Sequence, residues 1–179
     1  MLLLPLLWAV STTSSDVDED VVSFAPCGED GICITVMAAG SANNTVPKHY
    51  PTGFLKTPIP RRKQDKSLTQ GNLRASLNSN GLLTFQRVSD GKTLLQEKLK
   101  RTFTKTNLSV GESIQNGEIY YGVDVSFSAY ADEHIYGLGQ HKTGVLDNKG
   151  QTFQLQPENT EILIPVIHST RDYSLVWNL

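Results

Sequence analysis

The feature that most constrains the fold is a run in which apolar and polar side chains alternate, from residue 119 to residue 130. A two-residue period places the apolar side chains on one face of an extended strand, whereas a helix would scatter them around its axis. The run therefore predicts a long antiparallel strand with one face on a core and the other partly in water. The apolar set is Ile119, Tyr121, Val123, Val125, Phe127 and Ala129.

Shorter alternating runs surround this one, and turn residues separate them. Asn80-Gly81 and Asp90-Gly91 favour the tight primed turns of antiparallel hairpins. No apolar period of 3.6 residues extends beyond two turns, so we expect an all-β fold, an antiparallel β-sandwich. The other expected strands span residues 21–25, 32–37, 73–77, 83–85, 94–95, 153–155, 162–167 and 173–177.

The length of the chain bounds its domain organisation. At 179 residues it can form one domain, but it is too short to hold a sandwich and a (β/α)8 barrel of about 250 residues. Residues 16–179 are expected to form this domain, with an irregular, proline-containing loop at about 39–67. The net charge of −2, with both signs interspersed, indicates no nucleic-acid partner.

The first fifteen residues have the character of a secretory signal. An apolar stretch from Met1 to Val10 leads into small and hydroxylated residues up to Ser15. The stretch is too short to span a membrane, and it lacks a preceding Lys or Arg, so an anchoring N-terminus is the alternative. Asn43 and Asn107 begin glycosylation sequons. We therefore expect a signal peptide at 1–15 and a secreted protein.

Cys27 and Cys33 flank a turn-rich segment of five residues. In an oxidising compartment the two thiols could form a local disulfide across a hairpin, and two free thiols are the alternative. No histidine or further cysteine lies at metal-ligand spacing from them. We expect structural cysteines, no metal site and no cofactor.

The last third of the chain carries a motif, Tyr136-Gly137-Leu138-Gly139-Gln140-His141, with Asn159-Thr160 and the run 173–178 after it. Together with the meander at 72–97, and in this order, these blocks resemble the N-terminal β-domain of glycoside hydrolase family 31, the α-glucosidases and α-xylosidases. The resemblance covers roughly residues 67–178. It implies a galactose mutarotase-like β-sandwich, incomplete at its C-terminal end, from a chain truncated before the catalytic barrel.

In this family two barrel aspartates hydrolyse the sugar, and retaining hydrolysis needs its carboxyl groups about 5 to 5.5 Å apart. No position here matches their motifs, so no catalytic residue is carried over and we expect no hydrolysis by this chain alone. The resemblance implies a domain that packs on the barrel and serves an α-linked glucoside or xyloside through it. The acidic residues of the similar region show no pairing: Asp124, Asp132, Glu133, Asp147, Glu158, Glu161 and Asp172.

The resemblance also suggests roles for two segments. In relatives the loop at 156–160 can reach over the barrel mouth, where the amide of Asn159 and the hydroxyl of Thr160 would bind sugar hydroxyls. A turn-capping pair is the alternative for these two residues. Gly137 and Gly139 are expected to serve backbone geometry by allowing a tight turn or a close backbone approach. A dinucleotide site is not expected, because no helix follows them.

Two other functions fit the same residues. The chain could be a free-standing carbohydrate-binding protein, with Tyr120 and Tyr130 as stacking platforms for sugar rings. It could also be an aldose mutarotase relative, which would need a histidine and a carboxylate in one cleft. The candidate histidines are His134, His141 and His168.

Overall fold

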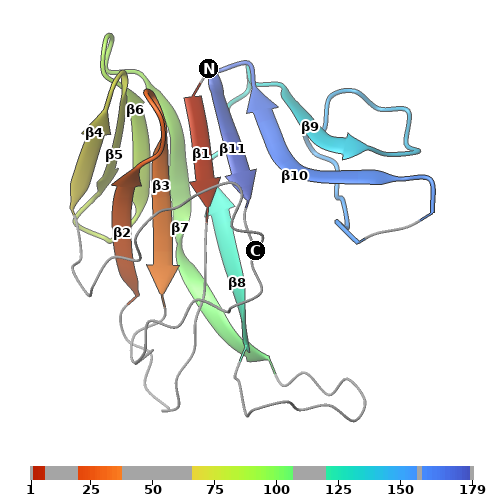
Figure 1. The fold of residues 1–179 in the computed structure, drawn as a ribbon, viewed down its shortest axis with the longest axis horizontal. Coiled ribbons are helices and arrows are strands. Elements are labelled where there is room, and N and C mark those ends of the chain that lie inside the picture. The colour runs from red at the N-terminus through yellow and green to blue at the C-terminus, as the bar shows by residue number, and fades with distance from the viewer. Residues whose placement is uncertain (1, 7–19, 38–65, 107–119, 157–158, 178–179) are drawn as a thin grey trace.

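The computed structural model describes residues 2–6, 20–37, 66–106, 120–156 and 159–177. These residues form strands and turns, and none of them lies in a helix that could cross a membrane. Figure 1 shows two sheets packed face to face. The strands are β1 (Leu2–Leu6), β2 (Val21–Pro26), β3 (Ile32–Met37), β4 (Ser67–Gln70), β5 (Leu73–Leu77), β6 (Leu83–Arg87), β7 (Thr93–Thr106), β8 (Tyr120–Phe127), β9 (Ile135–Gln140), β10 (Ile162–Ser169) and β11 (Tyr173–Trp177).

Sheet A has the strand order β2-β3-β1-β11-β10-β9, and sheet B has the order β4-β5-β6-β7-β8. All neighbouring strands are antiparallel except β1, which is parallel to both β3 and β11. The all-β, antiparallel sandwich expected from the alternating runs is confirmed.

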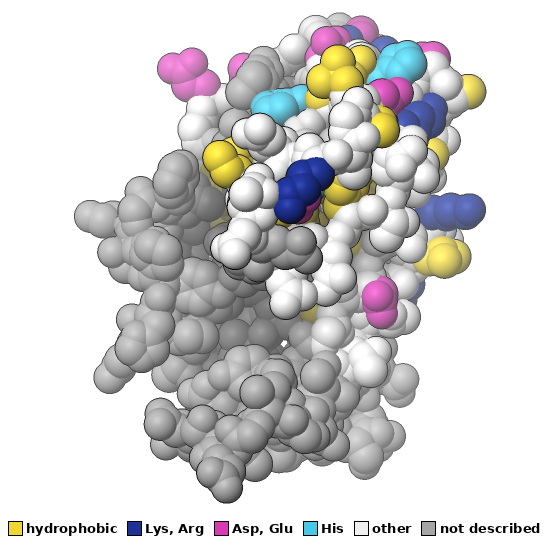
Figure 2. Space-filling view, turned by 90° about the vertical axis from the view of Figure 1, so that its right-hand side faces the viewer, with side chains coloured by type: hydrophobic (Ala, Val, Ile, Leu, Met, Phe, Trp, Pro, Cys, Tyr) yellow, Lys and Arg dark blue, Asp and Glu magenta, His cyan; other side chains and the backbone are white. Residues whose placement is uncertain are grey.

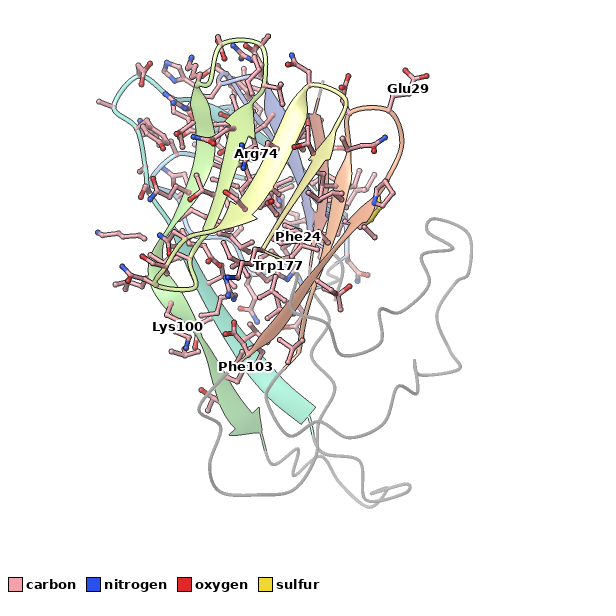
Figure 3. All side chains as sticks on the ribbon, turned by 90° about the vertical axis from the view of Figure 1, so that its left-hand side faces the viewer. Phe24, Glu29, Arg74, Lys100, Phe103 and Trp177 are labelled. Carbon is pink, nitrogen blue, oxygen red and sulfur yellow. A yellow bond between two sulfur atoms is a disulfide. The ribbon has the colours of Figure 1, made fainter. Side chains whose placement is uncertain are left out.

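One hydrophobic core joins the two sheets. Sheet A supplies mainly β-branched and aromatic side chains from β2, β3 and β11, and sheet B supplies mainly leucines from β5, β6 and β7. Figure 3 shows Phe24 and Trp177 in the layer between the sheets. Burying two inner faces against each other is the main source of stability in such a sandwich. The fully buried apolar side chains include Val22, Ile32, Val36, Leu73, Leu83, Phe85 and Leu94.

The strand that dominated the sequence pattern is present as β8. Val123, Val125 and Phe127 pack against the core, while Asp124 and Ser126 between them are exposed. The predicted alternation is therefore confirmed within the strand. It ends at Phe127, and Ala129, which the pattern placed on the apolar face, is exposed beyond the strand.

Four segments differ from the expectation. Residues 153–155 form no strand, because Phe153 packs instead on the ring of His141, with the two ring centroids 4.6 Å apart. β4 lies where the irregular loop was expected to end, and β9 lies where a turn was expected. β7 extends from Thr93 to Thr106, well past the two leucines that predicted it, because its second half pairs with β8 from Glu97 to Thr106.

The turns after β5 and β6 are hairpin turns, but they are not the primed type. Gly81 and Gly91 have φ of +74° and +70°, whereas Asn80 and Asp90 have no positive φ, which a type I′ turn would require. In the first turn, the Asn78 side chain explains the difference. Its Oδ1 accepts hydrogen bonds from the N–H groups of Asn80 at 2.9 Å and Leu82 at 3.0 Å.

A buried ion triad joins the start of β2 to the middle of β7. The Arg101 guanidinium donates to Asp20 Oδ2, with Nε at 2.8 Å, and it also contacts Glu97 Oε2. Arg101 and Glu97 side chains are 0% exposed and that of Asp20 is 8% exposed. Burial raises the pKa of the Glu97 carboxyl, against hydrogen bonds from the Leu83 N–H and Arg101. The triad therefore ties sheet A to sheet B with charges that cannot be hydrated.

A second polar cluster lies under the turn between β10 and β11. The hydroxyls of Ser169 and Tyr173 both donate to Glu133 Oε1, and burial with this carboxylate raises the pKa of Tyr173. Arg171 donates to the carbonyl of Thr93 at 2.6 Å, and its guanidinium lies 3.7 Å from the ring centroid of Tyr130. The cluster connects sheet A to the beginning of β7 in sheet B.

Cys27 and Cys33 are bonded in the structure, with their Cα atoms 5.6 Å apart across the β2–β3 hairpin. The same turn docks on the β4–β5 turn, because Asp30 Oδ1 accepts a 2.6 Å hydrogen bond from the N–H of Asn72. Both sequons, Asn43 and Asn107, and residues 39–65 of the expected loop lie outside the described residues. Of the expected signal peptide, residues 2–6 are described, as strand β1.

Reducing this disulfide is expected to lower the free energy of unfolding by about 2 kcal/mol, the size that loop-closure entropy predicts for so short a loop. Urea denaturation with and without a phosphine reductant measures the change. The Cys27→Ala/Cys33→Ala double variant is the control and should not respond to the reductant. A reductant effect of equal size in that variant would contradict the assignment to this bond.

Candidate functional site

The glycine motif Tyr136-Gly137-Leu138-Gly139-Gln140 lies in strand β9, at one edge of sheet A. Gly137, Leu138 and Gly139 have φ of +117°, +66° and +98°. A Cβ on Gly137 would collide with the carbonyl oxygen of Val166. A Cβ on Gly139 would come even closer to the carbonyl oxygen of Ile162. The two glycines thus allow the backbone of β9 to approach that of β10 more closely than any side chain would permit.

This approach coincides with an irregularity in the pairing of β9 with β10. Gly139 pairs with Leu163 and Gly137 pairs with Ile167, so β10 carries two more residues than β9 over the same interval. Pro165 lies within this bulge, where a ladder hydrogen bond is not required of it. The bulge bends β10 away from β11, as Figure 1 shows. We call the bent part of β9 and β10, residues 136–140 and 162–167, the arm.

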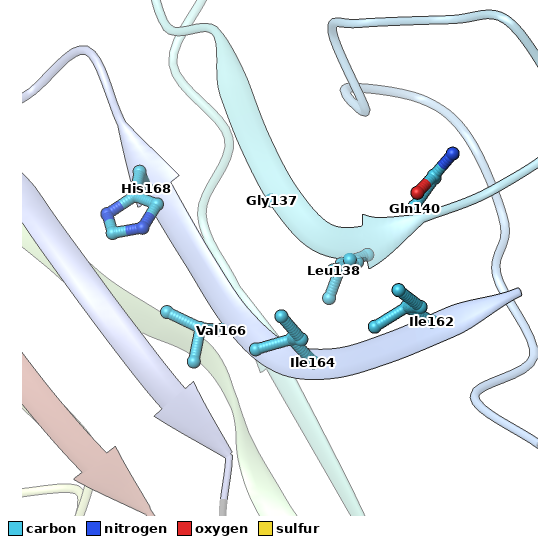
Figure 4. Close-up of a pocket in the computed structure, with 8 residues that line it drawn as sticks. Gly137, Leu138, Gln140, Ile162, Ile164, Val166 and His168 are labelled. Atoms are coloured by element: carbon cyan, nitrogen blue, oxygen red, sulfur yellow. The ribbon is translucent and has the colours of Figure 1, made fainter.

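Both faces of the arm are apolar and hollowed. On one face a hollow of about 340 Å³ is lined mainly by Leu138, Ile162, Ile164 and Val166, with Gln140 and His168 at its ends (Figure 4). On the other face a hollow of about 320 Å³ is lined by Leu138, Leu155, Pro165, Ile167, Leu175 and Trp177.

Large apolar side chains of the arm are open to solvent. Ile162 is 58% exposed and Ile164 is 47% exposed, and Leu155 beside the second hollow is 40% exposed. Figure 2 views this side of the molecule and shows hydrophobic side chains among basic, acidic and histidine groups. Exposed apolar side chains that line one hollow on a protruding element are typical of a protein–protein contact.

The loop that follows β9 is held in place by Glu161 and His141. His141 Nε2 donates to the carbonyl oxygen of Leu138 at 2.9 Å, and His141 Nδ1 lies 3.5 Å from Glu161 Oε2. Glu161 Oε1 accepts a 3.2 Å hydrogen bond from the N–H of Lys142. These contacts join the end of β9 to the start of β10, so the loop leaves and re-enters the arm at one place.

The predicted sugar-contacting residues lie on this loop, next to the arm. Lys142 Nζ donates to the backbone carbonyl of Asn159 at 3.2 Å, and Thr160 has a φ of +74°. Both side chains are exposed, and within the described residues neither has a hydrogen-bond partner. The amide of Asn159 and the hydroxyl of Thr160 therefore make no hydrogen bond that would hold the fold of the described residues together. Pro157 and Glu158 of the same loop lie outside the described residues.

The acidic residues of this region are bound separately rather than paired. Glu133 is buried with Ser169 and Tyr173, and Glu161 contacts His141. Asp132 and Asp172 lie beside arginines on the surface, and Asp124 is exposed on β8. Glu158 lies outside the described residues. Neither hollow of the arm is lined by a carboxylate. Within the described residues no group of three His, Cys, Asp or Glu side chains is arranged to hold a metal ion.

The three histidines of the mutarotase alternative also have separate partners. His134 contacts Asp147 and His141 contacts Glu161, while His168 shares a 2.7 Å hydrogen bond with Ser174 Oγ. His168 alone of the three lines a hollow of the arm, and no carboxylate accompanies it there. These contacts do not assemble a histidine–carboxylate cleft around either hollow.

The structure also places one of the two tyrosines of the sugar-binding alternative. The guanidinium of Arg171 covers one face of the Tyr130 ring, which is half-buried. That face cannot stack on a sugar ring without displacing the arginine. The side chain of Tyr120 lies outside the described residues.

The Asp147 carboxyl is expected to titrate with a pKa of about 2, chiefly because His134 Nδ1 donates to it at 2.6 Å. The N–H groups of Ile135 and Lys149 add further hydrogen bonds to the same carboxylate. Because this pKa is depressed, the contact stabilises the fold above pH 3.8 and is lost as the pH falls through about 2. Carbon-13 NMR of the carboxyl measures the midpoint. In His134→Ala the midpoint should move toward 3.8, and an unchanged midpoint would exclude His134 as the cause.

Comparison with known proteins gives a consistent result. Residues 48–178 match the family model described as the glycosyl hydrolase 31 N-terminal galactose mutarotase-like domain. An uncharacterized family 31 glucosidase, ORF2, of Pseudescherichia vulneris is 24% identical over 179 residues, covering 90% of this chain and 33% of the relative. The alpha-xylosidase of Saccharolobus solfataricus is 27% identical over 115 residues, covering 58% of this chain and 15% of that protein.

A solved structure agrees with these relatives. The crystal structure of the GH31 alpha-xylosidase from Xanthomonas citri matches with a TM-score of 0.54 and 32% sequence identity. The match covers 64% of this chain and 12% of the Xanthomonas chain. This chain thus spans about a third or less of the length of the relatives that it matches.

Proposed function

We propose, since this chain belongs to the glycosyl hydrolase 31 N-terminal galactose mutarotase-like domain family, that it works as the non-catalytic N-terminal domain of an α-glycosidase. The catalytic carboxylates would come from a catalytic barrel. The observation that carries the proposal is the arm, which combines exposed apolar faces with a polar turn beside them.

The arm would dock on the barrel. Its exposed isoleucines, Ile162 and Ile164, and the hollow beside them would be covered by apolar side chains of the barrel surface. Removing such side chains from water supplies the association energy, at about 25 cal/mol per Å². The bulge at Pro165 supports this role, because it turns the arm out of the plane of sheet A.

The turn at Asn159 and Thr160 would then bind the substrate. An amide and a hydroxyl can donate to and accept from neighbouring sugar hydroxyls without introducing charge near the cleavage point. The loop is anchored to both strands of the arm through Glu161, so docking the arm would also place the turn. Positioning by rigid elements of this kind is what a binding group requires.

We propose an α-linked glucoside or xyloside as the substrate, because the relatives are named as a glucosidase and as alpha-xylosidases. Sugar and linkage would be selected mainly by the barrel. The proposal further includes a secretory location, which the disulfide across the β2–β3 hairpin and the two sequons favour.

The test is to sequence the transcript past the codon for Leu179 and to express the polypeptide that it encodes. Hydrolysis of p-nitrophenyl α-xyloside and α-glucoside by that polypeptide, and by no preparation of residues 1–179, is the expected result. A stop codon in independent reads, together with saturable binding of xyloglucan oligosaccharides to residues 1–179, would overturn the proposal in favour of a free-standing sugar-binding protein.

In the complete enzyme, Asn159→Ala is expected to lower kcat/KM by about 10- to 100-fold, the usual effect of losing one or two hydrogen bonds to substrate. Gln151→Ala is the matched control, because Gln151 is an exposed amide on the same loop. It should leave kcat/KM within about twofold. Equal effects of the two substitutions would remove Asn159 from the substrate site while leaving the docking role of the arm intact.

A further inference from the structure

Sheet A contains a slot one strand wide between β3 and β11, which β1 occupies. β3 and β11 run in the same direction, since each is parallel to β1, and β2 and β10 on their far sides run the other way. Figure 1 shows these directions. A strand of opposite direction in the slot would make every neighbouring pair of the sheet antiparallel. The topology of the sheet thus favours an antiparallel strand at this position.

The present occupant fits the slot poorly in two further respects. β1 pairs with β11 along its whole length, but it pairs with β3 only at Leu6 and Ile34. It also contains Pro5, which has no N–H to donate, although the strand lies in the middle of a six-stranded sheet. Proline is ordinarily confined to edge strands and bulges for this reason.

We infer that the slot between β3 and β11 is an acceptor site for a strand of the catalytic polypeptide, running antiparallel to β11, and that β1 is an exchangeable occupant of it. This inference rests on the proposed function, which supplies that polypeptide. The length of the relatives agrees with it, because this chain covers 33% of the Pseudescherichia glucosidase and 12% of the Xanthomonas chain.

The walls of the slot specify the chemistry of the incoming strand. On the inner side it is bordered by Ile34, Leu175 and Trp177, all of which belong to or pack on the core. On the outer side it is bordered by Thr35 and by Ser174, whose hydroxyl shares a hydrogen bond with His168. The strand should therefore be apolar at every second position and carry small polar residues between, with no proline.

Exchange of the strand in the slot is also compatible with residues 1–15 being a secretory signal that is removed. If residues 1–15 are removed during secretion, β3 and β11 lose their common neighbour, and two rows of backbone N–H and C=O groups open toward water. An incoming strand would pair both rows. Either β1 or the incoming strand can therefore fill the slot. The strand that forms more backbone hydrogen bonds with β3 and β11 is favoured.

The test extends the 179-residue chain with Asn-Gly and then Val-Thr-Val-Thr-Val-Thr-Val, which can turn back from β11 into the slot as an antiparallel strand. The matched control carries the same extension with Pro in place of the second and third Val. We expect the melting temperature of the extended chain to exceed that of the control by at least about 5 °C. Hydrogen exchange of residues 2–6 should be fast in the extended chain and slow in the control.

Equal melting temperatures, with residues 2–6 protected in both chains, would show that β1 is the resident strand and overturn the inference. A dimer formed by the unextended chain, with β1 of one copy protected by the other, would also overturn it in favour of strand exchange between copies. These measurements need no hydrolysis, so they stand apart from the activity assay that tests the proposed function.

Discussion

Replacing Arg101 with methionine is expected to lower the free energy of unfolding by about 3–5 kcal/mol, because it leaves buried carboxylates without their counter-charge. Glu97 and Asp20 would then face each other in the interior, with the Glu97 side chain 0% exposed and that of Asp20 8% exposed. Glu97 Oε1 already has no hydrogen-bond partner within the described residues. Urea denaturation followed by tryptophan fluorescence measures the loss.

The control for this prediction is Arg87→Met. Arg87 makes two ion pairs, with Asp90 and Asp172, but these carboxylates are 47% and 75% exposed. Surface pairs of this kind contribute about 1 kcal/mol or less. If the two arginine variants lost equal stability, the buried triad would not be the inter-sheet tie described above. The double variant Arg101→Met/Glu97→Met should recover part of the loss, because it removes the buried Glu97 carboxylate and leaves only Asp20 without its counter-charge.

The stability of the Arg101→Met variant should depend on pH in a defined direction. Burial raises the pKa of Glu97 above its ordinary value of 4.5, and Arg101 opposes this rise. Without the arginine the pKa should rise further, so Glu97 in the folded variant holds its proton to higher pH. Stability of the variant is then greatest below pH 4.5 and falls as the pH rises through the pKa of the folded state. Its deficit relative to the parent should grow between pH 4.5 and pH 7.

Gly139→Ala is expected to lower the free energy of unfolding by about 3 kcal/mol. Its φ of +98° is unfavourable for an L residue, at a cost of about 1–2 kcal/mol, and the new Cβ would collide with the carbonyl of Ile162. The collision partner is backbone, so it cannot be relieved by rotating a side chain. Relieving this collision would require β9 and β10 to separate, which would also widen the hollow that both strands line.

Gly150→Ala separates the two costs. Gly150 has a similar conformational demand, with a φ of +74°, but a Cβ there would meet no atom within 4 Å. We expect this substitution to cost about 1–2 kcal/mol, the price of the backbone conformation alone. If Gly139→Ala and Gly150→Ala were equally destabilising, the close approach of β9 to β10 would be wrong.

Much of the fold could be predicted because alternation is a local property. The strands at 32–37 and 173–177 have the predicted bounds, and the partly buried face of β8 is the one that the two-residue period assigned. The glycine motif was recognised through a resemblance, but its conformation was not. A tight turn or a close backbone approach was expected there, and the segment is a strand with three successive positive φ values whose glycines lie close to β10.

The misses share a physical cause, which is contact between residues distant in the chain. Phe153 lies in an irregular segment because it packs on His141, and β7 continues because it pairs with β8 as far as Thr106. The buried Arg101 on β7 meets Asp20, 81 residues away. No local signal identifies a charged residue that will be buried, since burial depends on a partner from another strand. The candidate site was predicted only in part for the same reason. Asn159 was named from the sequence, whereas the anchoring role of Glu161 was not.

The sequence by itself determined which faces of the strands are buried and where most of the strands lie, because the period of apolar residues and the positions of turn residues are local properties of the chain. Only the tertiary structure decided which strands are neighbours, where β10 bulges against the glycines of β9, and that a slot in sheet A holds a parallel strand with a proline. Those outcomes depend on how closely distant backbones approach and on which hydrogen bonds remain unpaired, and neither is specified until the segments meet.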